Sequence, residues 1–232
     1  KDLAPFVPAL SRYEEPLDLN LVFSGHGKHL DCPTLRLTNH HGLMIAGEAA
    51  LSNWDAGMDM YIYGKLGNLT MTKEGINVLM TNLTGKVPPI LQRLDYIRFN
   101  GEAAGYLHDL TLTGLFHTGA GMVKTDVMMS IDEQSMSRTY SGSVASADLD
   151  LGKLLNQEKK FGKVDFNVEL KGFNYKNRYP ESYIKGIISS FEYSQYQYEN
   201  IMLDGVYKDG GFNGRLSMED ANGSVQIDGN FN

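Results

Sequence analysis

Apolar and polar residues alternate along the last part of the chain, between residues 198 and 232. Because neighbouring side chains of a β-strand point to opposite faces, a spacing of two places all the apolar residues on one side. Asp209-Gly210 and Asn222-Gly223 interrupt the alternation, and both pairs supply the positive φ angles of tight hairpin turns. This stretch therefore predicts a β-meander with one apolar and one polar face.

The same alternation recurs through most of the preceding chain. It predicts strands over residues 17–23, 34–38, 45–51, 58–65, 97–103, 110–116, 123–131, 140–144, 164–172 and 184–188. Two segments depart from it. Residues 72–83 carry apolar residues at helical spacing behind a capping Thr72, with a short turn from Pro88-Pro89 to Leu94, and residues 148–156 predict an Asp-capped helical turn.

These patterns predict an all-β fold, namely a long, curled, mostly antiparallel sheet with one or two short helices. Residues 1–16 form a proline-rich lead-in, and residues 17–232 form one elongated domain with two weak repeats, about 43–118 and 120–232. Stacked repeats of this kind share one apolar face without a closed centre.

Glycine recurs in phase with the apolar face, where a large side chain is expected. The set is Gly47, Gly64, Gly101, Gly114, Gly142, Gly172, Gly186, Gly214 and Gly229. One interpretation is that these glycines let a twisted sheet coil around its own core. The other is that they curl the sheet into a trough and leave space along its floor.

Composition excludes several classes of function. The 232 residues carry a net charge of −7, which argues against nucleic acid and against a broad contact with anionic headgroups. The single Cys32 cannot form an intrachain disulfide, and no apolar run is long enough to span a membrane. Because the chain starts at Lys1, we expect a piece of a longer protein whose anchor lies elsewhere.

Motifs for catalysis are missing from the sequence. No complete dinucleotide or phosphate loop occurs, and Ser141-Gly-Ser143 is not a nucleophile elbow. His26, His29 and the pair His40-His41 lie in expected turns without a clear partner cluster, so we expect no metal, no cofactor and no enzyme activity. The aromatic run Phe191 to Tyr198 fits either sugar stacking or cross-strand packing, and we favour packing.

Three segments carry a resemblance to a known family. They are Asp148-Leu-Asp-Leu-Gly-Lys-Leu-Leu155, Lys86-Val-Pro-Pro-Ile-Leu-Gln-Arg-Leu94 and the last third, with Tyr198-Glu-Asn-Ile-Met-Leu203-Asp-Gly205 and Gly211-Phe-Asn-Gly214-Arg-Leu216. In these segments the chain resembles the AsmA-like proteins, and most of all the TamB translocation and assembly modules. The resemblance covers residues 17–231.

The resemblance implies a periplasmic β-taco sheet with an apolar interior, belonging to a protein anchored in the inner membrane by an N-terminal helix outside this piece. It implies phospholipid movement between inner and outer membranes, help in outer-membrane protein assembly, and contact with an outer-membrane barrel assembly protein through other parts of the chain. It supplies no catalytic residues.

We therefore expect a non-enzymatic apolar groove for phospholipid acyl chains. Alternation predicts its lining as Leu19, Leu21, Phe23, Leu35, Leu37, Ile45, Met60, Ile62, Ile97, Phe99, Leu110, Leu112, Val127, Met129, Phe166, Val168, Leu170, Ile188, Leu203, Phe212, Leu216, Val225, Ile227 and Phe231. The alternatives are a scaffold that pairs its edge strands with client β-proteins and a structural β-helix or adhesin segment with a closed core.

Overall fold

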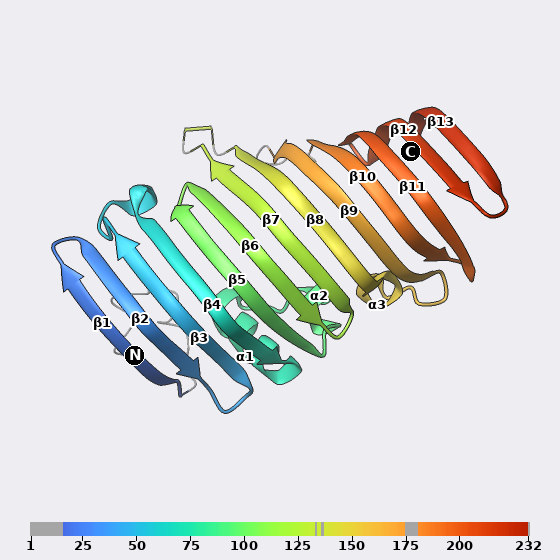
Figure 1. Ribbon diagram of the computed structural model, residues 1–232. Coiled ribbons are helices and arrows are strands. Elements are labelled where there is room, and N and C mark those ends of the chain that lie inside the picture. The colour runs from blue at the N-terminus through green and yellow to red at the C-terminus, as the bar shows by residue number, and fades with distance from the viewer. Residues whose placement is uncertain (1–15, 133, 136, 175–180, 232) are drawn as a thin grey trace.

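The computed structural model describes residues 16–132, 134–135, 137–174 and 181–231. Its strands are β1 (Asp18–His26), β2 (His29–Thr38), β3 (Leu43–Ser52), β4 (Tyr61–Thr72), β5 (Tyr96–Tyr106), β6 (Asp109–Thr118), β7 (Gly121–Ile131), β8 (Arg138–Asp150), β9 (Phe161–Asn174), β10 (Glu181–Tyr193), β11 (Tyr196–Lys208), β12 (Gly211–Asp220) and β13 (Gly223–Phe231). All thirteen belong to one sheet in sequence order (Figure 1). The predicted lead-in, except for Pro16, lies outside the described residues.

Each strand from β2 to β12 pairs antiparallel with the strand before it and the strand after it, and β1 and β13 each pair with one neighbour among the described residues. Several hairpins turn where glycine or aspartate adopts positive φ, as at Gly27, Asp209 and Gly210. Ser194 and Gln195, which join β10 to β11, also have positive φ. Asn222 and Gly223 lie at the β12–β13 turn without positive φ, so the prediction was wrong for that pair. Such turns are short enough to return the chain directly alongside itself, so the sheet is a continuous meander.

The sheet is open and uncurled. This confirms the predicted all-β class, with one long antiparallel sheet and a few short helices. The curling predicted from the glycine pattern is not present, and β1 and β13 form two separate edges (Figure 1).

Neighbouring aromatic rings fill several of the glycine positions, which explains why those positions leave no hollow floor. A Cβ added at Gly101 would lie 2.6 Å from Cζ of Phe99, and one at Gly205 would lie 2.7 Å from Cζ of Phe212. At Gly172 the added Cβ would lie 2.6 Å from the hydroxyl oxygen of Tyr140. A large ring over a glycine supports a strand that lacks a side chain of its own.

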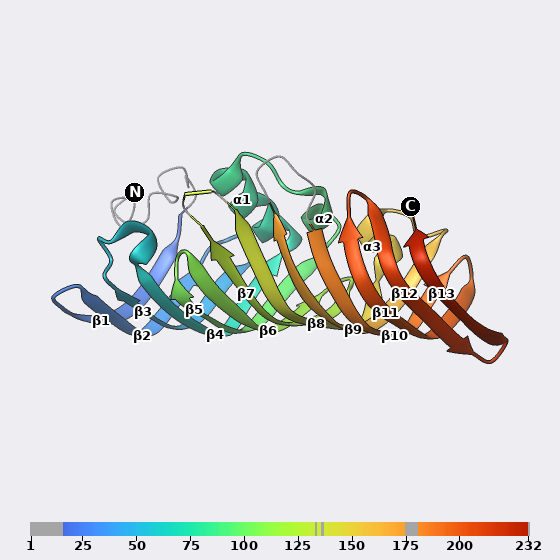
Figure 2. The same ribbon diagram turned by 90° about the horizontal axis from the view of Figure 1, so that it is seen from above.

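Three short α-helices interrupt the meander where the sequence predicted them: α1 (Lys73–Thr84), α2 (Pro89–Gln92) and α3 (Leu151–Leu155). The hydroxyl of Thr72 accepts a hydrogen bond from Gly75 N at 3.2 Å, and the carboxylate of Asp150 accepts one from Lys153 N at 2.8 Å. A 3-10 turn, η2 (Gly57–Asp59), precedes β4. The α-helices gather at one end of the strands and on one side of the sheet (Figure 2).

The main buried cluster forms where these helices meet the sheet. Ile76 of α1 packs with Leu94, with Ile97 of β5 and with Ala120 of the β6–β7 turn, and Leu69, Met71 and Phe116 surround them. A lone sheet has no second layer to bury its apolar side, so burial is greatest beneath the helices. The two predicted repeats stay a prediction, although β4–α1–α2–β5 and β8–α3–β9 place their helices at the same end of the strands.

Candidate functional site

Strand pairing places the alternating apolar rows of the strands on the same side of the sheet, which we call the apolar face, although single apolar residues such as Met202 lie on the other side. Residues directly opposite each other in an antiparallel pair share a face. A chain of such pairs links Leu19 to Leu37, Leu37 to Ile45, Ile45 to Leu69, and Leu69 to Phe99. A second chain links Phe166 to Ile188, Ile188 to Ile201, and Ile201 to Met218.

All but two of the predicted lining residues lie on the apolar face. Phe23 itself makes no ladder pair, because the β1–β2 pairing is irregular between Val22 and Ser24. It lies between Leu21 and Gly25, which both pair with residues of the apolar face, so the additional residue of this irregularity belongs to β2. Met60 precedes β4 and makes no ladder pair, because it follows the 3-10 turn. The backbone of Phe231 pairs with Phe212, and its side chain lies outside the described set. Whether the face holds lipid stays a prediction.

The apolar face is covered unevenly. At β4 to β7, side chains from the α1–α2 segment, among them Met80, Val87 and Leu91, pack against it. From β9 to β13 its side chains are mostly half-buried by their own neighbours, as at Leu170, Leu203 and Leu216. At the last strand Val225 and Ile227 are exposed.

The opposite side, which we call the polar face, carries cross-strand hydrogen bonds and ion pairs. Tyr183 donates to Asp204 at 2.6 Å, Lys185 lies 3.4 Å from the same carboxylate, and Arg215 contacts Asp228 at 3.1 Å. The hydrogen bond from Tyr183, together with the interactions of Lys185, lowers the pKa of Asp204. These pairs lie in solvent, which makes the polar face the hydrated side of the sheet.

A hollow of about 630 Å³ lies mainly on the polar face, near the ends of β7 to β11. Met128, Lys171 and Tyr183 are among the residues that line it. The hollow is not the predicted acyl groove, because most of these side chains belong to the other side of the sheet.

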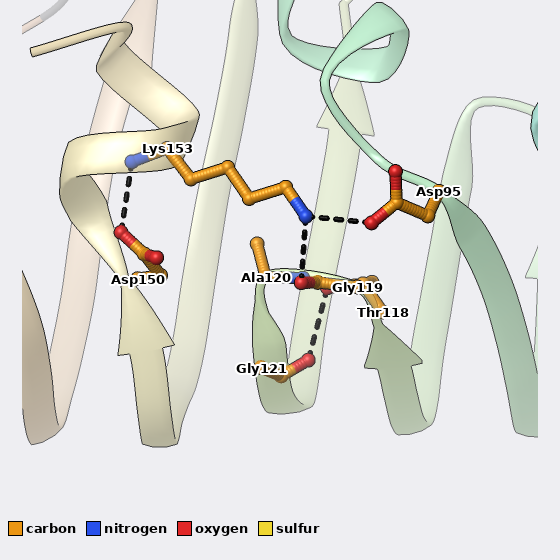
Figure 3. Close-up of polar contacts among 7 residues, drawn as sticks. All are labelled: Asp95, Thr118, Gly119, Ala120, Gly121, Asp150 and Lys153. Atoms are coloured by element: carbon orange, nitrogen blue, oxygen red, sulfur yellow. Dashed lines mark hydrogen bonds and ion pairs between the residues drawn. The ribbon is translucent and has the colours of Figure 1, made fainter. Parts of the chain in front are cut away.

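Lys153 forms the polar junction between the helical segments (Figure 3). Its ammonium group donates to Asp95 Oδ2 at 2.7 Å and to the carbonyl of Gly119 at 3.0 Å. The hydrogen bond and charge of Lys153 lower the pKa of Asp95. Arg93 donates to the carbonyl of Leu154 and adds a second link between the α2 and α3 regions. Both cations of this junction are thus engaged in holding the helices together.

Five aromatic rings form a continuous row at the same end of the strands, on the apolar face beside α3. We call Phe161, Phe191, Tyr193, Tyr196 and Tyr198 the aromatic row. Ring centroids lie 5.4 Å apart for Phe161 and Tyr193, 6.4 Å for Phe191 and Tyr198, and 4.6 Å for Tyr196 and Tyr198. The cross-strand packing that we favoured for residues 191–198 is therefore present.

The side chain of His29 contacts two neighbouring polar residues. His29 contacts Ser52 Oγ at 2.7 Å through Nδ1 and Asp31 Oδ2 at 2.9 Å through Nε2. Within the described ranges, no three histidine, cysteine, aspartate or glutamate side chains converge in a way that could hold a metal ion.

Sequence reasoning missed several members of the apolar face. Phe161 begins β9 beside Tyr193, and Tyr140 pairs with Met129 and Gly172. The alternation Tyr140, Gly142, Val144 carried the signal for Tyr140, whereas Phe161 directly follows a turn and alternation did not identify it.

None of the helices in the described part of the chain has the length and apolar character needed to cross a membrane. Comparison of the chain with protein-family models, curated proteins and solved structures finds no match. The resemblance to the AsmA-like family therefore stays a prediction from the sequence.

Proposed function

We propose that this chain is a non-enzymatic lipid-binding segment, whose apolar face holds or conducts the acyl chains of phospholipids between two membranes. The observation that carries the proposal is the region of the apolar face from β9 to β13 that the α1–α2 segment does not cover. Val225 and Ile227 are exposed there, and Leu203 and Leu216 are only half-buried. A periplasmic location, in a protein of the AsmA-like kind, is part of the proposal because the sequence resembles that family.

The dimensions and energetics of the face suit this role. Thirteen strands at about 4.8 Å spacing give a sheet roughly 58 Å wide. Each methylene that an acyl chain buries against such a face is worth about 0.8 kcal/mol. The face has an aliphatic lining and few polar anchors, so a chain can shift along it without breaking specific bonds.

Adjacent residues of β11 offer a matched test. Leu203 lies on the apolar face, and Met202 lies on the polar face with 57% of its surface exposed. Leu203→Glu puts a charge where acyl chains would bind, whereas Met202→Glu puts the same charge on the hydrated side. We expect the first variant to lower binding of a fluorescent acyl phospholipid at least tenfold and the second to leave it unchanged.

Native mass spectrometry of the purified chain gives an independent measurement. Co-purified phospholipid in the parent chain and in Met202→Glu, but not in Leu203→Glu, would support the proposal. Equal lipid binding by all three, with circular dichroism showing that each is folded, would refute it.

The free edges of the sheet favour a second candidate, a scaffold for outer-membrane protein assembly. Within the described residues, β1 pairs only with β2, and β13 pairs only with β12. Unpaired edge strands can add a strand from another chain. Gln226→Pro removes a backbone donor from β13 and should abolish capture of an unfolded outer-membrane barrel protein, whereas Gln226→Thr should not. Unchanged capture by the proline variant would exclude this edge.

A further inference from the structure

The aromatic row and the lysine beside it mark one end of the apolar face from β9 to β11 as chemically different from the rest. In the middle of these strands Val168, Ile188 and Leu203 are aliphatic. Towards the α3 end, the same face changes to phenylalanine and tyrosine. A change from aliphatic to tyrosine-rich surface is typical of the level at which a bilayer passes from acyl chains to headgroups.

Lys160 provides a cation at this end. Its Nζ lies 5.8 Å from the centroid of Phe161 and 5.9 Å from that of Tyr193. Within the described ranges, Lys160 makes no ion pair, in contrast to Lys153, Lys163, Lys185 and Lys208. The backbone of Lys160 is fixed beside the rings, because its carbonyl accepts a hydrogen bond from Ser194 N at 2.7 Å.

The tyrosines of the row differ in how their hydroxyl groups are used. Tyr196 donates to Asp220 Oδ2 at 2.9 Å and accepts from Asn222, so its hydroxyl is already hydrogen-bonded to the β12–β13 turn. Among the described residues, the hydroxyl groups of Tyr193 and Tyr198 make no hydrogen bond. Two hydroxyl donors and one ammonium group are therefore available beside an aliphatic surface.

We propose that this end of the apolar face, formed by Lys160, Tyr193 and Tyr198, binds the phosphodiester headgroup of an anionic phospholipid. The lipid's acyl chains then extend along the aliphatic part of β9 to β11. The inference rests on the proposed function and adds to it a ligand class and an orientation. The ammonium group of Lys160 lies over the ring of Tyr193, and Tyr198 lies further along the same row. Such donors suit a phosphate, because a charged acceptor strengthens each hydrogen bond that it receives. The headgroup contact is local, which is compatible with a net charge of −7.

Two fluorescent lipids with identical acyl chains separate the headgroup from the chains. One is phosphatidylglycerol and the other is diacylglycerol, which lacks the phosphate. We expect the parent chain to bind phosphatidylglycerol more tightly, with a preference that weakens as salt screens the exposed charge. Lys160→Gln should reduce phosphatidylglycerol affinity about threefold to fivefold, in the range of an exposed ion pair, and should leave diacylglycerol affinity unchanged.

Lys159→Gln is the matched control, because it removes the same charge from an adjacent exposed position that has no ring contact among the described residues. The double variant Tyr193→Phe with Tyr198→Phe keeps both rings and removes both hydroxyls, and we expect it to reduce the phosphatidylglycerol preference. Inorganic phosphate at millimolar concentration should not displace the lipid, because the acyl chains of the lipid add to the affinity of its phosphodiester headgroup.

Four results would overturn the inference. Equal affinity of the parent chain for the two lipids would remove the headgroup site and leave the proposed function standing. Equal losses in Lys159→Gln and Lys160→Gln would show diffuse attraction instead of a site. Displacement by inorganic phosphate would indicate a free-anion site. Failure of the parent chain to bind either lipid would refute the proposed function together with this inference.

Discussion

Two regions of the same apolar face differ in what covers them. Between β4 and β7 the helical segments form a partial second layer, and Ile97 and Phe99 retain only 8% and 7% of their surface exposed. At β13 no such layer exists in the described part of the chain, and Val225 and Ile227 remain 44% and 42% exposed. The alternating pattern is the same in both regions, so pattern alone does not decide burial.

The difference separates two roles for one kind of surface. Where helices cover the face, each buried side chain stabilises the fold through the hydrophobic effect. Where nothing covers it, the same residue types add little to folding and leave apolar area in water. Exposed contiguous apolar surface of this kind commonly marks a binding site. Substitutions matched across the two regions test this division.

The largest effect is expected from truncating isoleucine in the covered region. Ile97→Ala removes buried methyl groups and leaves a cavity beneath α1, so we expect the free energy of unfolding to fall by about 3 kcal/mol. Ile227→Ala makes the same change on the uncovered edge strand and should cost less than about 1 kcal/mol. Urea unfolding of both variants gives the comparison. Equal losses would mean that β13 is buried by something other than the described residues.

Glycine substitutions test how the floor of the face is filled. Gly205→Ala would place Cβ 2.5 Å from the carbonyl oxygen of Asn213 and 2.7 Å from the Phe212 ring. We expect a loss of about 2 kcal/mol from this overpacking.

Gly64 is the control, because an added Cβ there meets nothing within 4 Å. Gly64→Ala should be neutral or stabilise by about 0.5 kcal/mol through the unfolded chain. Thermal unfolding monitored by circular dichroism would order the two variants. A stabilised Gly205→Ala would contradict the role assigned to the Phe212 ring.

Thr72 tests how firmly the covering helix is attached. Its hydroxyl caps α1 and also donates to the carbonyl of His41 at 2.8 Å, which ties the helix to the β2–β3 turn. Thr72→Ala should cost about 1 kcal/mol. Thr111→Ala, on the polar face of β6, should cost only a few tenths of that amount. Hydrogen exchange of the variant can be compared with that of the parent chain. A larger increase in exchange rate at the amides of α1 than at those of β13 would localise the loss to the covering helix.

Sequence predicted the strands and the face far better than the curvature. Alternation identified Leu35, Leu170 and Ile227 correctly because period two is a local property. It did not identify Phe161, which directly follows a turn and has no alternating neighbour before it.

The curl was wrong for a reason of long-range packing. Glycine in phase with the face suggested space, but the ring of Phe99 lies over both Gly101 and Gly114. Which ring covers which glycine depends on register between strands, and that register is not a property of one segment. The role of Lys160 depends likewise on the ring of Tyr193, 33 positions away in the sequence.

The smallest expected effect concerns the junction that joins the covering segments. Lys153 lowers the pKa of Asp95 in the folded chain below its ordinary value of 3.8, so the carboxylate stabilises the fold above that pH. The contribution disappears as pH falls through the depressed folded pKa. Asp95→Asn should therefore lower the melting temperature slightly at pH 7 and leave it nearly unchanged at pH 2.

In a Lys153→Met background the pH 7 difference between the chain with Asp95 and the Asp95→Asn variant should shrink towards zero, because the carboxylate has lost its main partner. Lys153→Met itself should be the more damaging change, since Lys153 also donates to the carbonyl of Gly119 at 3.0 Å. A pH 7 difference that persists in Lys153→Met would assign the effect to another neighbour of Asp95, such as Lys73.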